Sequence, residues 1–161
     1  MTFHSQASNL VTGDTNGQWD VFVHDRQLRK TVRVSVSSAG GQGNNTSGES
    51  GASVSGNGRY VVFGSYASNL VSGDTNGGSD VFIRDRDTDG DAIFDEAGAV
   101  ATTRVSVSSG GSQGNRESRV SGTSSLSPDG RYVVFYSGST NLVTGDTNAM
   151  DDVFRRDRGT P

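Results

Sequence analysis

The sequence has no cysteine, only two prolines and no long apolar run. The lack of cysteine excludes disulfides, thiolate metal sites and a cysteine nucleophile. No stretch approaches the roughly 18 consecutive apolar residues of a membrane-spanning helix, so membrane insertion is not expected. The first residues lack the basic and apolar regions of a signal peptide. An exported form would therefore carry its signal on another part of a longer protein.

Large apolar residues and clustered positive charge are also scarce. Apolar and aromatic residues make up 30% of the 161 residues, 23 residues are glycine, and the formal net charge is −4. A thin hydrophobic core follows. Nucleic-acid binding is not expected, because neutralising phosphates requires a basic face. The few large apolar residues recur in short clusters such as YVVF and DVF, which indicates order through repetition rather than disorder.

One sequence unit recurs along the chain. The segment QASNLVTGDTNGQWDVFVHDR at 6–26 returns in closely similar form at 66–86 and at 138–158. Between these copies lie TVRVSVSS at 31–38 and TTRVSVSS at 102–109. A period of this length with four strand signals per unit is typical of propeller blades or a related array, and not of a helical solenoid.

The second period is longer than the first. The interval from Phe63 to Phe135 exceeds the interval from Phe3 to Phe63. An insertion after the second DVF segment, within 85–98, accounts for most of this difference, because the first copy has no counterpart to it. The insertion is rich in acidic residues.

Side-chain alternation predicts four strands in each unit. GRYVVFGS at 58–65 is apolar on both alternating faces, which is typical of a strand covered on both sides. TVRVSVSS at 31–38 places valines on one face and arginine and serines on the other, which predicts a half-buried strand nearer the outside. DVFVHDR at 20–26 is a short strand, and the Ser-Pro-Asp-Gly turn at 127–130 joins two more. The predicted fold class is all-β, with tandem four-stranded antiparallel propeller-type blades.

The SPDGRYVVF segment at 127–135, and the order GRYVVF, DVF, RVSVSS within a unit, resemble the WD-like repeats of TolB-type β-propellers. The resemblance covers nearly the whole chain and implies a binding or interaction module. The chain departs from the usual short blade in its longer loop, SNLVTGDTNG, so no ligand site of other propellers can be transferred to it.

The strand order is out of phase with the blades at both ends. We expect a single repeat array over 1–161, with a partial blade at 1–38, a blade at 39–109 that contains the acidic insertion 85–98, and a partial blade at 110–161. Propellers close with about four to eight blades, and this chain holds about two and a half. Open strand edges recruit other strands. Either the blades join those of other chains in a ring or fibre, or the chain is a fragment of a longer polypeptide.

The repeated D-T-N-x-x-x-D loops are the first candidate metal sites. Three side-chain oxygens within one such loop can converge on one calcium ion, with backbone carbonyls and water completing its shell. The alternative is that these residues only form Asx turns, aided by Gly17 and Gly77. Ala149 replaces these glycines in the third copy, which predicts that positive φ is not required and weakens the turn explanation. The candidate ligands are Asp14, Asn16 and Asp20, then Asp74, Asn76 and Asp80, then Asp146, Asn148 and Asp152.

The insertion is the second and more specific candidate. It fits the EF-hand loop pattern D-x-[DN]-x-[DN]-G-x5-E. Resemblance to calcium loops would make Asp85, Asp87 and Asp89 the first ligands, Asp91 a backbone-carbonyl ligand and Glu96 the bidentate carboxylate. A register that starts at Asp87 is the alternative. The flanks read as strands, so an isolated acidic loop is expected, and the alternative is a solvated acidic turn.

Catalysis has little support in the sequence. The only histidines are His4 and His24, and His24 aligns with Arg84 and Arg156 in the other copies. Nothing positions a Ser-His-Asp arrangement, so an enzyme is not expected.

Two functions remain. The first is a non-catalytic, calcium-stabilised, extracellular or cell-surface module that self-associates through open blade edges. The alternative is a fragment of a larger secreted propeller that binds a glycan or protein through its variable loops. Trp19, the sole tryptophan, would either pack on its own blade or stack on a sugar or a neighbouring subunit.

Overall fold

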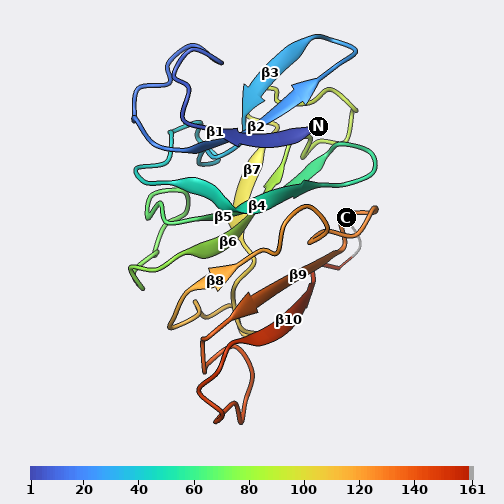
Figure 1. Cartoon of the computed structure of the whole chain (residues 1–161). Coiled ribbons are helices and arrows are strands. Elements are labelled where there is room, and N and C mark those ends of the chain that lie inside the picture. The colour runs from blue at the N-terminus through green and yellow to red at the C-terminus, as the bar shows by residue number, and fades with distance from the viewer. Residues whose placement is uncertain (160–161) are drawn as a thin grey trace.

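The computed structural model describes residues 1–159, which contain strands and loops and no helix (Figure 1). Ten strands form three small antiparallel sheets, so the all-β prediction is confirmed. The sheets are β1-β2-β3 (Thr2–Ser5, Asp20–Asp25, Lys30–Arg33), β4-β5-β6-β7 (Ser47–Val54, Tyr60–Ser65, Asp80–Asp85, Ala101–Arg104) and β8-β9-β10 (Ser118–Arg119, Tyr132–Ser137, Asp152–Asp157). They follow one another from top to bottom of Figure 1 in sequence order. The described residues close into neither a barrel nor a propeller, and they hold no helix that could cross a membrane.

The three sheets share one strand register. In each, a phenylalanine of the YVVF-type strand lies opposite the phenylalanine of the DVF strand. Their rings stack, with centroids 5.6, 6.0 and 5.6 Å apart, in the pairs Phe3–Phe22, Phe63–Phe82 and Phe135–Phe154. The sequence repeat is therefore also a structural repeat, and positions can be compared from sheet to sheet.

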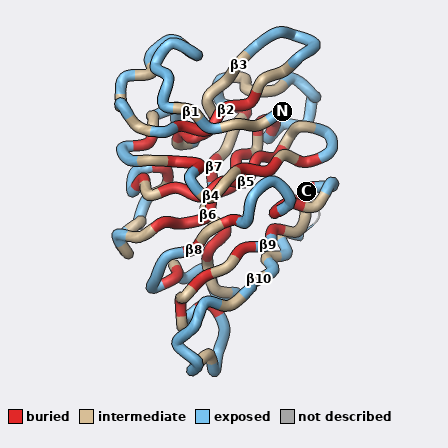
Figure 2. The backbone as a smooth tube through the Cα atoms, in the orientation of Figure 1, coloured by how far each residue is buried: buried red, intermediate tan, exposed pale blue. Residues whose placement is uncertain are grey.

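The hydrophobic core lies between successive sheets (Figure 2). One cluster joins the first two sheets through residues such as Val21, Val23 and Phe63. The other joins the second and third sheets through residues such as Ile83 and Phe135. Every residue of β5 is buried, which confirms the prediction that this strand is covered on both faces.

The RVSVSS segment differs from its prediction. β3 ends at Arg33 and β7 at Arg104, and the serines that follow, Ser35 and Ser106, are fully buried instead of facing solvent. Alternation alone misplaced them. Each hydroxyl donates a hydrogen bond to a buried carboxylate, and this bond compensates for its loss of contact with water.

The prediction for Ala149 is wrong, because its φ is +56°. Asn148 Oδ1 accepts a hydrogen bond from the Met150 N–H, and the residue between them adopts the left-handed conformation. Gly17 and Gly77 have φ values of +66° and +67° in the equivalent turns. The Asx turn is thus part of all three loops, whatever else they bind.

Candidate functional site

The first acidic loop closes around an arginine from the neighbouring strand. Arg33 Nη1 lies 3.1 Å from Asp14 Oδ1 and 3.3 Å from Asp20 Oδ2. The other oxygen of Asp20 accepts a hydrogen bond from Ser35 Oγ, and Asp20 itself has no exposed surface. Asn16 donates Nδ2 to Asp20, while its Oδ1 accepts the N–H of the turn, so the amide oxygen does not join the carboxylates. In this loop a guanidinium lies against two of the carboxylates that the sequence offered as candidate metal ligands.

The second loop repeats this arrangement. Arg104 Nη1 lies 3.4 Å from Asp74 Oδ1 and 3.1 Å from Asp80 Oδ2. Ser106 Oγ donates to Asp80 Oδ1, and Gln113 Nε2 donates to both aspartates. Burial, and then the charge of Asp80, raise the pKa of Asp74 above its usual value despite the nearby arginine. Two buried carboxylates thus share one guanidinium.

The third loop has the same turn but lacks an arginine. Asn148 donates Nδ2 to Asp152 Oδ2 at 3.0 Å, as Asn76 does to Asp80. Asp146 and Asp152 form no ion pair with any residue that the structure describes. A cavity of about 430 Å³ opens beside them, lined by Val143, Thr144, Gly145, Asp146, Thr147, Asn148, Asp152, Val153 and Phe154. The loop is exposed at the lower end of Figure 2.

The insertion brings three of its acidic residues together. Ligand atoms of Asp87, Asp89 and Asp91 lie within 4.8 Å of one another. Asp87 is 4% exposed, and its two oxygens accept hydrogen bonds from the N–H groups of Gly90 and Ala92. The other two carboxylates of the group are exposed. These three residues can offer oxygen ligands to a hard cation.

Two other residues of the EF-hand pattern lie outside this group. Asp85 accepts a bidentate pair of hydrogen bonds from Arg59, at 2.7 and 2.8 Å. Glu96 is not among the clustered carboxylates of the described chain. Its neighbour Asp95 forms an ion pair with Arg86, an interaction that no sequence pattern indicated. The loop therefore does not have the ligand set of a full EF-hand.

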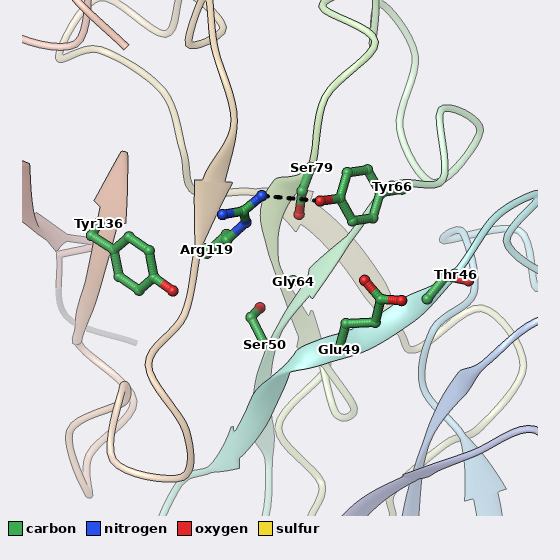
Figure 3. Close-up of a pocket in the computed structure, with 8 residues that line it drawn as sticks. All are labelled: Thr46, Glu49, Ser50, Gly64, Tyr66, Ser79, Arg119 and Tyr136. Carbon is green, nitrogen blue, oxygen red and sulfur yellow. Dashed lines mark hydrogen bonds between the residues drawn. The ribbon is translucent and has the colours of Figure 1, made fainter. Parts of the chain in front are cut away.

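A pocket between the second and third sheets was not foreseen from the sequence. It has a volume of about 280 Å³ and is lined by Thr46, Glu49, Ser50, Gly64, Tyr66, Ser79, Arg119 and Tyr136 (Figure 3). Arg119 extends between the two tyrosines and donates to Tyr66 Oη at 3.2 Å. It also forms an ion pair with Glu117. A second cavity of about 400 Å³ shares Arg119 and Tyr136. The combination of aromatic rings and a guanidinium suits a polar or acidic ligand.

Variation between copies was the only sequence signal for this pocket. Tyr66 stands where the other copies have Gln6 and Gly138, and Tyr136 corresponds to His4 and Gly64. In the first sheet Trp19 packs on His4, with ring centroids 5.3 Å apart, and remains 39% exposed.

Comparisons of the chain with protein-family models, with curated proteins and with solved structures give no match. The functional argument therefore depends on the geometry of the loops, the sheet faces and the pocket.

Proposed function

We propose that the chain is a non-catalytic repeat module whose sheets act as blades of a propeller-type array and associate with further units of the same kind. One observation carries the proposal. Val62 and Val81 of the second sheet are fully buried against the third sheet, whereas the equivalent Val134 and Val153 are 41% and 76% exposed. Apolar side chains at these positions suit a face that another sheet covers. The resemblance to TolB-type propellers is consistent with this arrangement.

A recurrent contact between sheets supports the same mode of association. Arg84 Nη1 of the second sheet donates to the Ser37 carbonyl, in the loop that follows β3 of the first sheet, at 3.1 Å. Arg156 Nη1 of the third sheet donates to the Ser108 carbonyl, in the loop that follows β7 of the second sheet, also at 3.1 Å. The chain thus uses one docking geometry twice, and an additional unit can use it again.

Sedimentation velocity over a range of concentrations tests self-association. The wild type should sediment as species larger than the monomer, and Val153→Asp should shift it to the monomer by placing a charge in the interface. The matched control is Leu28→Asp, because Leu28 is similarly exposed, at 74%, but lies in the β2–β3 hairpin. A wild type that stays monomeric, or equal effects of the two variants, would refute the proposal.

The calcium proposal now centres on the insertion. Asp87, Asp89 and Asp91 form no ion pair with the described residues, whereas an arginine pairs with both aspartates in each of the first two DTN loops. Three carboxylates without the bidentate glutamate suit the weak affinity of extracellular modules, about 10⁻⁴ to 10⁻³ M. Calorimetric titration should show a site that Asp89→Asn removes and the exposed control Asp129→Asn leaves intact. Absence of binding in the wild type would refute calcium without affecting the self-association proposal.

The pocket of Figure 3 supports a second candidate function, recognition of a glycan. Sugars stack on tyrosine rings, and Arg119 between Tyr66 and Tyr136 would favour acidic ones. Saturation-transfer NMR with neutral and acidic oligosaccharides tests this. Binding should be lost in Tyr136→Ala and kept in Leu28→Ala. If no oligosaccharide gives a signal, the candidate fails.

A further inference from the structure

The free edge of β10 corresponds to an edge that is covered in both other sheets. β2 pairs with β3 and β6 pairs with β7, whereas β10 pairs only with β9 among the described residues. The covering strands place Arg33 opposite Phe22 and Arg104 opposite Phe82. Phe154 holds the equivalent position on β10. An unpaired edge presents backbone donors and acceptors to an additional strand.

The loop beside this edge has the same groups that contact the arginine in the first two sheets. Arg33 Nη2 donates to the Gly13 carbonyl and Arg104 Nη2 to the Gly73 carbonyl, both at 3.2 Å, while each Nη1 contacts the two aspartates of its loop. The equivalent residues of the third loop are Gly145, Asp146 and Asp152, and all three line the cavity of about 430 Å³. This cavity therefore has the carbonyl and both carboxylates that hold a guanidinium in the other two sheets.

In the first two sheets, the serine two residues after the arginine forms a second recurrent set of contacts. Ser35 and Ser106 each donate Oγ–H to the buried aspartate and accept the N–H of the following valine, Val21 or Val81, at 3.1 Å. The residue between arginine and serine also donates its N–H to the carbonyl of that valine. On β10, Asp152 and Val153 are the corresponding groups.

We propose that the β10 edge accepts an extended strand with the sequence Arg-x-Ser, donated by another polypeptide that carries this repeat. The donated strand runs antiparallel to β10 with its arginine opposite Phe154. The guanidinium enters the cavity between Asp146 and Asp152. The serine hydroxyl donates a hydrogen bond to Asp152 and accepts one from the Val153 N–H. This inference rests on the proposed self-association and names the partner strand. Charge complementarity and the filled sites in the first two sheets favour this occupant over an apolar peptide.

A fluorescein-labelled peptide with the sequence of residues 102–109, Thr-Thr-Arg-Val-Ser-Val-Ser-Ser, tests the proposal by fluorescence anisotropy. The full chain should bind it saturably. Replacing the peptide arginine by glutamine, or Asp152→Asn in the protein, should weaken binding by about tenfold or more. Asp151→Asn is the matched control, because Asp151 is exposed, adjacent and outside the cavity lining. No saturable binding, or equal losses in Asp151→Asn and Asp152→Asn, would overturn the proposal.

Disulfide trapping tests the register. The chain has no cysteine, so Arg155→Cys introduces a single thiol on the exposed strand. Ile83, its equivalent, lies opposite Thr103, so a peptide with cysteine at its second position should crosslink under a mild oxidant. Cysteine at the first position would face the opposite side and should crosslink much more slowly. Equal rates would overturn the register.

The two proposals fail separately. Peptide binding is measured at protein concentrations where sedimentation gives a monomer. Self-association without peptide binding would refute the strand-acceptor inference alone. Peptide binding by a chain that stays monomeric at every concentration would refute the self-association proposal alone.

Discussion

Truncation of the same aspartate in two sheets should have very different effects on stability. Asp80 is fully buried and accepts hydrogen bonds from Ser106, Arg104 and two side-chain amides. Asp80→Ala leaves Asp74 as the only carboxylate partner of Arg104 and removes the acceptor of the buried Ser106 hydroxyl. Removal of one partner from a buried ion pair costs about 3–5 kcal/mol. For a chain of this size the expected fall in Tm is about 6 to 20 °C.

Asp152→Ala is the matched variant. Asp152 is half-buried, and among the described residues it accepts a side-chain hydrogen bond only from Asn148. The loss of one such bond costs about 0.5–1.5 kcal/mol. The two variants remove the same atoms from the same loop motif, so the difference between them, about 1.5–4.5 kcal/mol, measures what the arginine-closed arrangement contributes.

Urea unfolding followed by far-UV circular dichroism gives both values, first with calcium and then with a chelator. The difference should be the same in both conditions if the ion pair with Arg104 supplies the charge balance of Asp80. Two outcomes would refute the reasoning. One is equal destabilisation by the two variants. The other is a difference that disappears in the chelator, which would assign the charge balance to calcium.

Two further predictions concern a turn and the response to acid. Gly130 and Gly58 occupy equivalent turns, with φ of +77° and +82°, but a Cβ on Gly130 would overlap the Tyr60 ring. Gly130→Ala should therefore cost at least about 1 kcal/mol more than Gly58→Ala in urea unfolding, and equal costs would contradict this. A hydrogen-bonded guanidinium lowers the pKa of Asp157 to about 2, so its stabilising contribution is present above pH 3.8 and is lost as the pH falls towards 2. The raised pKa of Asp74 gives the opposite pH dependence. Its contribution to folding stability is present below its ordinary pKa and is lost as the pH rises through the raised value. Carboxyl-detected NMR titration should place the two pKa values on opposite sides of 3.8, and the same side for both would contradict this.

The strands could be predicted from the sequence because their signals are local. The alternation in residues 58–65 indicated a strand covered on both faces, and β5 is buried at every position. The repeat indicated which strands are equivalent, and the shared Phe–Phe register agrees with it. Side-chain period and residue type are properties of a few consecutive residues, so no knowledge of tertiary structure was needed.

The partners of the acidic residues could not be predicted in the same way. Asp85 is 26 residues from Arg59, and Arg33 is 13 residues from Asp20. A sequence pattern records which oxygens lie close along the chain, but a guanidinium and a calcium ion attract the same oxygens. Only the tertiary structure determines which of these two cations lies beside the oxygens. For the same reason the burial of Ser35 was missed, since its partner lies on another strand.

The repeat allows one conclusion that a single loop would not. An arginine on a neighbouring strand is a cation that cannot diffuse away, and in each of the first two DTN loops it pairs with both aspartates. The third loop has the equivalent carboxylates but, among the described residues, no arginine paired with them. The positive charge beside them therefore has to come from whatever binds at the β10 edge. A free cation at that loop would compete with a donated strand for Asp146 and Asp152. Calcium should therefore weaken binding of the arginine peptide, whereas a metal-bridged contact would require calcium to strengthen it. Whether calcium weakens or strengthens binding of the arginine peptide therefore distinguishes strand donation from metal bridging at the β10 edge.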